Sequence, residues 1–209
     1  MKFYDCSTAP SPRRARMFIA EKGLEIETVE IDMRAGEQLS PEFKAINPHC
    51  TVPVLELDNG TRLITTAGIR RYLEAVQPEP SLLGASAEQQ GIIADLVWHI
   101  EFDGFMAMAE SLRNSAPRLK GHALTGPVGY EQIPDLAERG KLRVQRFLDG
   151  VDAMIGDKPF VAGTDLSAAD IDLLIMIDFA GWLKFRLPED ANDARRWHEA
   201  MSARPSAKL

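Results

Sequence analysis

The residue best placed to bind a small ligand is Thr66, which follows a predicted hairpin. Alternating apolar residues over 54–57 and 61–64, joined through Asn59-Gly60, predict two antiparallel strands, because this turn pair tolerates the positive φ of a tight turn. Thr66 stands where the N-cap of the next helix belongs. The free N–H groups and the positive dipole end of such a helix bind a carboxylate. The sequence therefore predicts an anion site at this helix start.

A second group of reactive side chains follows the first predicted strand, in residues 6–16. A thiol in such a loop would suggest disulfide exchange, but Cys6 at the end of a strand is more typical of a small buried residue. Ser11 precedes Pro12 and is predicted as the N-cap of a helix. Arg14 and Arg16 are expected on the solvated face of that helix. Arg13, in its first turn, is a candidate for steering an anionic ligand.

The elements that position these residues alternate between strands and helices up to about residue 76. Strands are predicted at residues 2–6 and 28–31, with a helix at 12–22 between them, and Ser40-Pro41 begins a short helix. The hairpin and the helix at Thr66 complete the order β-α-β-α-β-β-α. Residues 77–80 contain two prolines and are predicted as a linker.

The remainder of the chain, from residue 86, is predicted to contain helices only. Ser86 and Gln89 form a capping-box pattern that begins a long helix with apolar residues at helical spacing. Residues 114–130 form an unusually long loop, of the kind that often serves as a lid or binding element. After a helix at 134–154, Ser167 and Asp170 form a second capping box, whose role is assigned to folding.

Composition restricts the class of protein. The chain has 209 residues, 45% of them hydrophobic and 26% charged, which is enough to form one or two cores without disulfides or metals. A net charge of −7 argues against broad binding to nucleic acid or anionic membranes. Cys6 and Cys50 have no metal-ligand spacing and are expected as free thiols in a reducing compartment. The expectation is a cytoplasmic protein with no metal and no membrane span.

Residues 51–74, with Val52-Pro53, a hairpin and a polar pair at a helix start, resemble the glutathione-binding half of the glutathione transferases. The capping box at Ser167 and Asp170 matches the helical domain of that family, so the resemblance covers nearly the whole chain. It implies an α/β N-terminal thioredoxin-like domain at residues 1–77 and an all-α C-terminal domain at residues 86–209. It also implies a cis bond before Pro53, which turns the backbone of Val52 toward the cysteinyl part of glutathione.

The resemblance assigns further residues to glutathione, the expected co-substrate. Gln38 and His49 match positions for its glycyl end, and Thr65 with Thr66 match those for its γ-glutamyl end. Thr65 departs from the family, which usually has an acid or amide there. The catalytic serine of serine-type members would align with Pro10, another departure. The loop instead resembles the bacterial and fungal members of the family, some of them disulfide reductases, that have Asn at the position of Ser11, and this resemblance makes Ser11 the catalytic candidate. Two interpretations of Ser11 remain open: its hydroxyl stabilises the glutathione thiolate, or it only caps the helix.

The resemblance also implies a second-substrate pocket in the helical domain, for which the candidates are Trp98, Phe102, Phe105 and Met106. An aromatic and Met stripe on a helix is also typical of a core. The implied protein is a homodimeric transferase acting on a small hydrophobic electrophile, with no nucleic-acid or membrane partner. Two alternatives stay open, a glutathione-dependent disulfide reductase and a non-catalytic binding protein.

Overall fold

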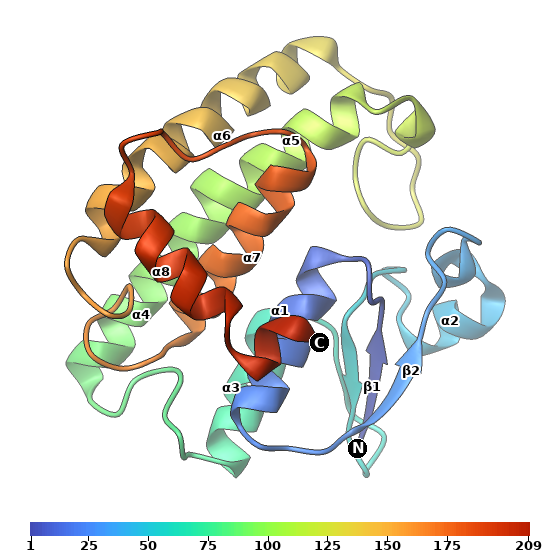
Figure 1. The fold of residues 1–209 in the computed structure, drawn as a ribbon. Coiled ribbons are helices and arrows are strands. Elements are labelled where there is room, and N and C mark those ends of the chain that lie inside the picture. Colours follow the sequence, from blue (N-terminus) through green and yellow to red (C-terminus); the bar gives the residue numbers. More distant parts are fainter. The chain divides into compact units, whose positions relative to one another are not determined.

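The computed structural model describes residues 1–209 and divides into two compact units (Figure 1). One unit comprises Met1–Pro80 together with Thr125–Val128 and Leu209, and the other comprises Ser81–Leu124 and Gly129–Lys208. The boundary at Pro80 lies in the stretch that the two prolines mark as a linker. None of the helices combines the length and the apolar character that crossing a membrane requires.

The N-terminal unit has the thioredoxin-like order β-α-β-α-β-β-α. Its elements are β1 (Lys2–Asp5), α1 (Pro10–Glu21), β2 (Glu27–Glu30), α2 (Pro41–Ile46), β3 (Val54–Glu56), β4 (Arg62–Leu63) and α3 (Thr66–Val76), with a 3₁₀ turn at Glu37–Leu39 before α2. The strands form one mixed sheet in the order β2-β1-β3-β4. β1 is parallel to β2 and antiparallel to β3, and β3 is antiparallel to β4.

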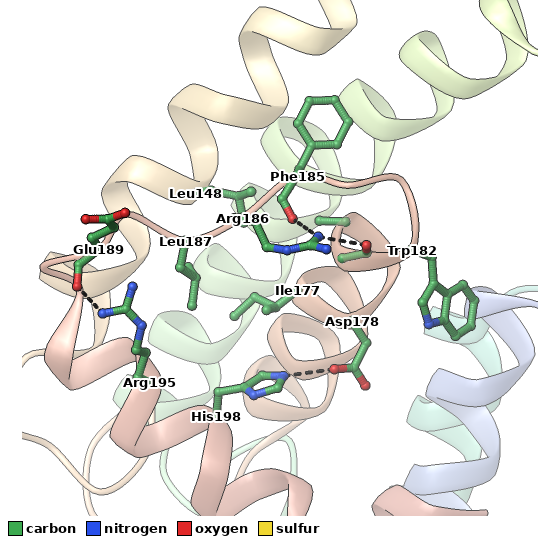
Figure 2. Close-up of a pocket in the computed structure, with 12 residues that line it drawn as sticks. Leu148, Ile177, Asp178, Trp182, Phe185, Arg186, Leu187, Glu189, Arg195 and His198 are labelled. Carbon is green, nitrogen blue, oxygen red and sulfur yellow. Dashed lines mark hydrogen bonds and ion pairs between the residues drawn. The ribbon is translucent and has the colours of Figure 1, made fainter.

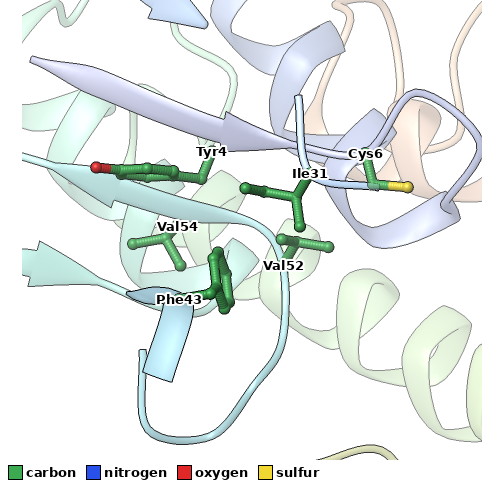
Figure 3. Packing of buried hydrophobic residues seen from close by; sticks show 6 residues of the cluster. All are labelled: Tyr4, Cys6, Ile31, Phe43, Val52 and Val54. Atoms are coloured by element: carbon green, nitrogen blue, oxygen red, sulfur yellow. The ribbon is translucent and has the colours of Figure 1, made fainter. Parts of the chain in front are cut away.

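Strand alternation gives the sheet two buried faces. Tyr4 pairs with Val54, and both belong to a cluster with Phe43 of α2, where the Tyr4 and Phe43 rings meet edge to face at 6.3 Å (Figure 3). The neighbouring pair, Phe3 and Leu55, is also fully buried and faces the opposite side, because successive side chains of a strand point to opposite faces. Helices on both faces therefore fix the strands from which the loops emerge.

Two helix starts differ from the sequence prediction. α1 begins at Pro10 with Ala9 as its N-cap, so Ser11 lies inside the first turn and is not the cap. α3 has Thr65 as its N-cap, because the Thr65 hydroxyl accepts the Gly68 N–H at 3.0 Å, and Thr66 is the first helical residue. Pro10 suits a first helical position as well as Pro12 does, because a proline there has no N–H to leave unpaired.

The hairpin forms as predicted, but only one turn residue has a positive φ. Leu57 N–H donates to Thr61 O, and Gly60, at φ 83°, is the left-handed residue. Asn59 instead accepts the Thr61 N–H through its side chain. This pattern is that of a three-residue hairpin loop, in which glycine adopts the left-handed conformation without a steric penalty.

The C-terminal unit contains helices and no ladder of strands. Its elements are α4 (Ala87–His99), a π-helical segment (Ile100–Phe105), α5 (Met106–Ser115), α6 (Pro134–Ile155), α7 (Ala168–Trp182) and α8 (Asn192–Ser202), with short 3₁₀ turns at Pro117–Leu119 and Pro205–Lys208. Ser86 caps α4 as predicted, by accepting the Gln89 N–H at 3.2 Å. The Gln89 side chain accepts the N–H of Ala85 and does not return to Ser86.

α7 is the central helix of this unit, and every residue from 168 to 176 is buried. Its capping box forms, with the backbone N–H and the hydroxyl of Ser167 both donating to Asp170 Oδ2, at 3.0 and 2.8 Å. Asp170 Oδ1 accepts the Val161 N–H and the Trp197 indole N–H. Burial raises the pKa of the Asp170 carboxyl, although these four bonds oppose the increase. The cap therefore connects three separate parts of the unit.

The predicted long helix is interrupted between α4 and α5 by the π-helical segment. A π-helix adds a residue per turn, so side chains after it occupy a different face from the one that uninterrupted helical spacing predicts. Phe105, the last residue of this segment, is buried, whereas Trp98, Phe102 and Met106 are about half exposed. Sequence spacing does not reveal this interruption.

Candidate active site

One edge of the N-terminal sheet collects the loops that carry the predicted glutathione residues. Since β1 is antiparallel to β3 and β3 to β4, the end of β1, the start of β3 and the end of β4 lie at the same edge. The end of β2 joins them, because β2 is parallel to β1. Cys6, Val52, Ala9 and Ile64 pack in one apolar cluster at this edge. The topology therefore brings the starts of α1 and α3 beside Val52.

Two pairs of side chains hold the loop between β1 and α1. The Ser7 N–H and hydroxyl both donate to Glu30 Oε1, at 2.8 and 2.9 Å. Arg16 Nη1 donates to both oxygens of the buried Asp5, and Asp5 also accepts the N–H of Cys6. Arg16 is therefore an interior link between α1 and β1, and Arg14 is 95% buried, so the prediction of a solvated arginine face is wrong for both.

Ser11 provides the one free backbone donor at the start of α1. Pro10 and Pro12, on either side, have no N–H, and the Arg13 N–H donates to Ala9 O at 3.3 Å. Ser11 is half buried, and its hydroxyl makes no hydrogen bond within the protein. A ligand atom at this helix start would therefore find both an N–H and an O–H donor on Ser11.

Val52 and Pro53 are buried and are joined by a cis peptide bond, as the family resemblance implies. Val52 packs in the apolar cluster through its side chain. Asn47 fixes the preceding segment, since its amide nitrogen donates to Thr51 O at 2.7 Å and to Thr51 Oγ1 at 3.1 Å. The backbone before Pro53 is thus held by the apolar packing of Val52 and by the hydrogen bonds from Asn47 to Thr51.

The start of α3 has the features of an anion site. Thr65 is exposed, Thr66 is half exposed, and the first turn of the helix carries no acidic residue. The N–H groups of this turn and the positive end of the helix dipole favour a carboxylate. The Thr65 hydroxyl accepts the Gly68 N–H and keeps its own O–H as a donor, so both Thr65 and Thr66 offer a hydroxyl donor at this helix start.

Gln38 and His49 occupy different settings. Gln38 Oε1 is buried and has no hydrogen-bond partner, which is costly for a polar atom unless a ligand supplies a donor. His49 is exposed. The His49 carbonyl oxygen lies 3.5 Å from the position that a Cβ atom would take at Gly126. Gly126 is in the tip of the long loop, Thr125–Val128, which belongs to the N-terminal unit.

The predicted second-substrate residues form a stripe in the C-terminal unit, with one exception. Trp98 and Phe102 stack with their ring centres 4.9 Å apart, and the Arg143 guanidinium lies 5.0 Å from the Phe102 ring. Met106 continues this exposed stripe, whereas Phe105 is 91% buried and packs in the interior. His99 Nδ1 lies 3.2 Å from Asp103 Oδ2 beside the stripe.

The sequence did not point to Asp5, Ser7, Glu30 or Arg16 as residues that shape the loop beside Ser11. Their contacts join positions 11 and 23 residues apart. No local spacing rule predicts such pairs, since they depend on how α1 and β2 pack against β1. A charged residue at the end of a strand, such as Asp5, was the one available signal.

Comparison with known proteins agrees with this architecture. Residues 8–76 match the family model "Glutathione S-transferase, N-terminal domain" and residues 110–205 the model "Glutathione S-transferase, C-terminal domain". The chain is 31% identical over 211 aligned positions to glutathione S-transferase 2 of Saccharomyces cerevisiae, covering 100% of this chain and 88% of the relative.

Two solved structures show the same fold at full length. Gtt2 from Saccharomyces cerevisiae superposes with a TM-score of 0.89 at 31% identity, covering 100% of this chain and 99% of that one. A glutathione S-transferase domain-containing protein from Marinobacter aquaeolei also gives 0.89, at 32% identity and 99% coverage of both chains. With both domain models matched and relatives aligned along the whole chain, this protein belongs to the glutathione S-transferase family.

Proposed function

We propose that this protein is a glutathione transferase that binds glutathione at the edge of the N-terminal sheet and activates its thiol. The observation that carries the proposal is the convergence of three features at that edge: the free donors of Ser11, the backbone before Pro53 and the start of α3. Together they offer a donor for a thiolate, a peptide backbone to pair with and a helix end for a carboxylate.

In this proposal each residue has a distinct role. The α-carboxylate of the γ-glutamyl group binds at Thr66, the cysteinyl backbone pairs with Val52, and the glycyl end lies toward Gln38 and His49. Ser11 donates a hydrogen bond to the sulfur, which favours the thiolate at neutral pH. The thiolate sulfur then forms a bond to the electrophilic carbon of the second substrate, and the leaving group departs with the electron pair of the broken bond. Trp98, Phe102 and Met106 supply the apolar surface proposed for that substrate.

In this proposal the γ-glutamyl ammonium has no carboxylate partner beside Thr65, because the first turn of α3 contains no acidic residue. We propose that the protein is a cytoplasmic homodimer and that an acid of the partner subunit, from the segment equivalent to residues 101–103, meets this ammonium. Sedimentation velocity at micromolar concentration tests the dimer: a single species of monomer mass contradicts it.

Calorimetric titration with glutathione tests the binding step, with S-methylglutathione as a control that keeps both carboxylates and lacks the ionisable thiol. We expect both to bind, and an absence of heat up to about 10 mM, a weak limit, contradicts the proposal. Turnover tests the reaction. Release of chloride from a chlorinated nitrobenzene is expected, whereas reduction of a small disulfide alone would identify a reductase, and binding without turnover a non-catalytic protein.

A further inference from the structure

A cavity that the proposed reaction does not use lies wholly within the C-terminal unit (Figure 2). It is bounded by the end of α7, the start of α8 and the loop between them, with Leu148 of α6 behind, and its volume is about 660 Å³. Sites for drug-sized organic molecules usually have volumes of roughly 300–1,000 Å³. The cavity is therefore large enough for a small organic ligand.

The interior of the cavity is apolar. Leu148, Ile177, Ala180 and Leu187 line it, and Leu148 and Ala180 are each 99% buried. In Figure 2, Ile177 and Leu187 point into the space between α7 and α8. An aromatic or branched aliphatic group is the ligand part that such a lining accommodates.

Two arginines flank this apolar interior. Arg186 Nη1 donates to Gly181 O at 2.8 Å and to Phe185 O at 2.7 Å, and these bonds hold its exposed guanidinium over the cavity. Arg195, from α8, donates to the carbonyls of Pro188 and Glu189. A guanidinium has five N–H donors, so Arg186 keeps its Nε and Nη2 donors for a ligand.

The two carboxylates that line the cavity do not pair with the Arg186 guanidinium. Asp178 is paired with His198, whose Nε2 lies 2.8 Å from Asp178 Oδ1. Glu189 lies on the opposite side of the cavity from that pair in Figure 2. A fixed guanidinium above an apolar interior matches a molecule with an anionic head and an apolar body.

We propose that this cavity is a second binding site, separate from the glutathione site, for an aromatic carboxylate. The carboxylate pairs with Arg186, and the ring lies against Ile177 and Leu187, which are the partly exposed apolar side chains of the lining. The alternative is that Arg186 serves only to fasten the loop after α7. The two differ in a measurable way, because a purely structural arginine gives the cavity no preference for an anion.

The test uses 2-naphthoate as the probe and the neutral 2-naphthalenemethanol as its matched control, both titrated calorimetrically into the full chain. The wild-type protein should bind the carboxylate at least fivefold more tightly than the alcohol. Arg186→Gln should weaken naphthoate binding about tenfold, the scale of one charge-assisted hydrogen bond, and leave alcohol binding unchanged. Leu187→Trp should fill the cavity and weaken both probes. Arg118→Gln, at an exposed arginine of the Pro117–Leu119 turn, is the control and should change neither.

Three outcomes of these titrations overturn the proposal: equal affinity for the two probes, unchanged naphthoate binding in either Arg186→Gln or Leu187→Trp, or equal weakening by Arg118→Gln. Displacement of naphthoate by saturating glutathione would also overturn it, because the anion would then occupy the glutathione site. Failure of glutathione to bind at all would contradict the proposed function and leave the three variant comparisons intact. Circular dichroism identifies any variant that does not fold, and Arg186→Lys, which keeps the charge, then replaces Arg186→Gln with an expected partial loss.

Discussion

Arg16 Nη1 lies 2.7 Å from Oδ1 and 2.6 Å from Oδ2 of Asp5, so one nitrogen of α1 holds both oxygens of a carboxylate at the end of β1. Asp5 is 97% buried, and Arg16 Nη2 lies 3.3 Å from the carbonyl of Leu209, the last residue. The ion pair joins the end of β1 to α1, the two elements that flank the loop before Ser11. It therefore helps to fix the position of Ser11.

Arg16→Met should lower the free energy of unfolding of the N-terminal unit by about 3 kcal/mol, because it leaves a buried carboxylate without its partner. Adding Asp5→Asn should recover part of the loss, since the unpaired charge is then gone. Cys6 and Cys50 are both buried in this unit, so urea-dependent labelling of the thiols measures its unfolding directly. A double variant no more stable than Arg16→Met would show that the charge of Asp5 is not what Arg16 compensates.

Ser11→Ala should lower turnover by roughly ten- to a hundredfold, because a hydrogen bond to a charged group contributes about 1.5–3 kcal/mol. The pKa of the bound glutathione thiol should rise, and the pH-rate profile should move to higher pH with it. The variant keeps the Ser11 N–H, so some activation should remain. Thr8→Val, at the next hydroxyl of the loop, is the control. An unchanged profile for Ser11→Ala would assign the sulfur contact to the backbone N–H or to a group of the helical domain.

Thr65→Asp should tighten glutathione binding by roughly 1 kcal/mol, the range of a partly exposed charge pair. Aspartate keeps the N-cap acceptor that the structure shows for Thr65 and adds the missing acid. Thr65→Glu should gain less, because glutamate is a poorer cap. The gain should shrink at high salt, since screening weakens an exposed pair. If glutathione and its deaminated analogue are affected equally, the γ-glutamyl ammonium does not lie beside Thr65.

Glu110 gives the C-terminal unit a pH-dependent contact. Partial burial raises the pKa of Glu110, but hydrogen bonds and charge from Arg139 and Arg143 of α6 outweigh it, so the pKa lies below its ordinary value. A carboxyl with a lowered folded pKa stabilises the protein above its unfolded pKa, and this stability is lost as pH falls through the folded pKa.

Glu110→Gln should therefore lower the urea midpoint at pH 7. The difference from wild type should begin to shrink near pH 4, about the ordinary pKa of a glutamate, and should disappear only below the lowered pKa of the folded state. All three tryptophans, Trp98, Trp182 and Trp197, are in the C-terminal unit, so tryptophan fluorescence follows this transition. Glu138→Gln, at an exposed glutamate of α6, is the control. A constant difference across the pH range would mean that packing of the side chain, and not its charge, is what matters.

The element order of the N-terminal unit, the hairpin through Gly60 and the three serine caps at Ser40, Ser86 and Ser167 are present in the sequence, because each depends on residues within about four positions of one another. The family can also be recognised from the sequence, because each of its motifs lies within a short stretch of the chain. The helix starts at Pro10 and Thr66 were missed by one or two residues, since more than one nearby residue can act as a cap.

The contacts between side chains of different elements depend on how those elements pack. The inward placement of Arg14 and Arg16, the Ser7–Glu30 contact and the burial of Phe105 depend on how elements pack and on the π-helical segment between α4 and α5. The same is true of the cavity beside Arg186, which is formed by residues from α6, α7, α8 and the loop between the last two. The spacing of residues in the sequence shows which side chains share a face of one helix or strand. Contacts between elements depend instead on the volume and charge of side chains that are far apart in the sequence, and no local pattern predicts them.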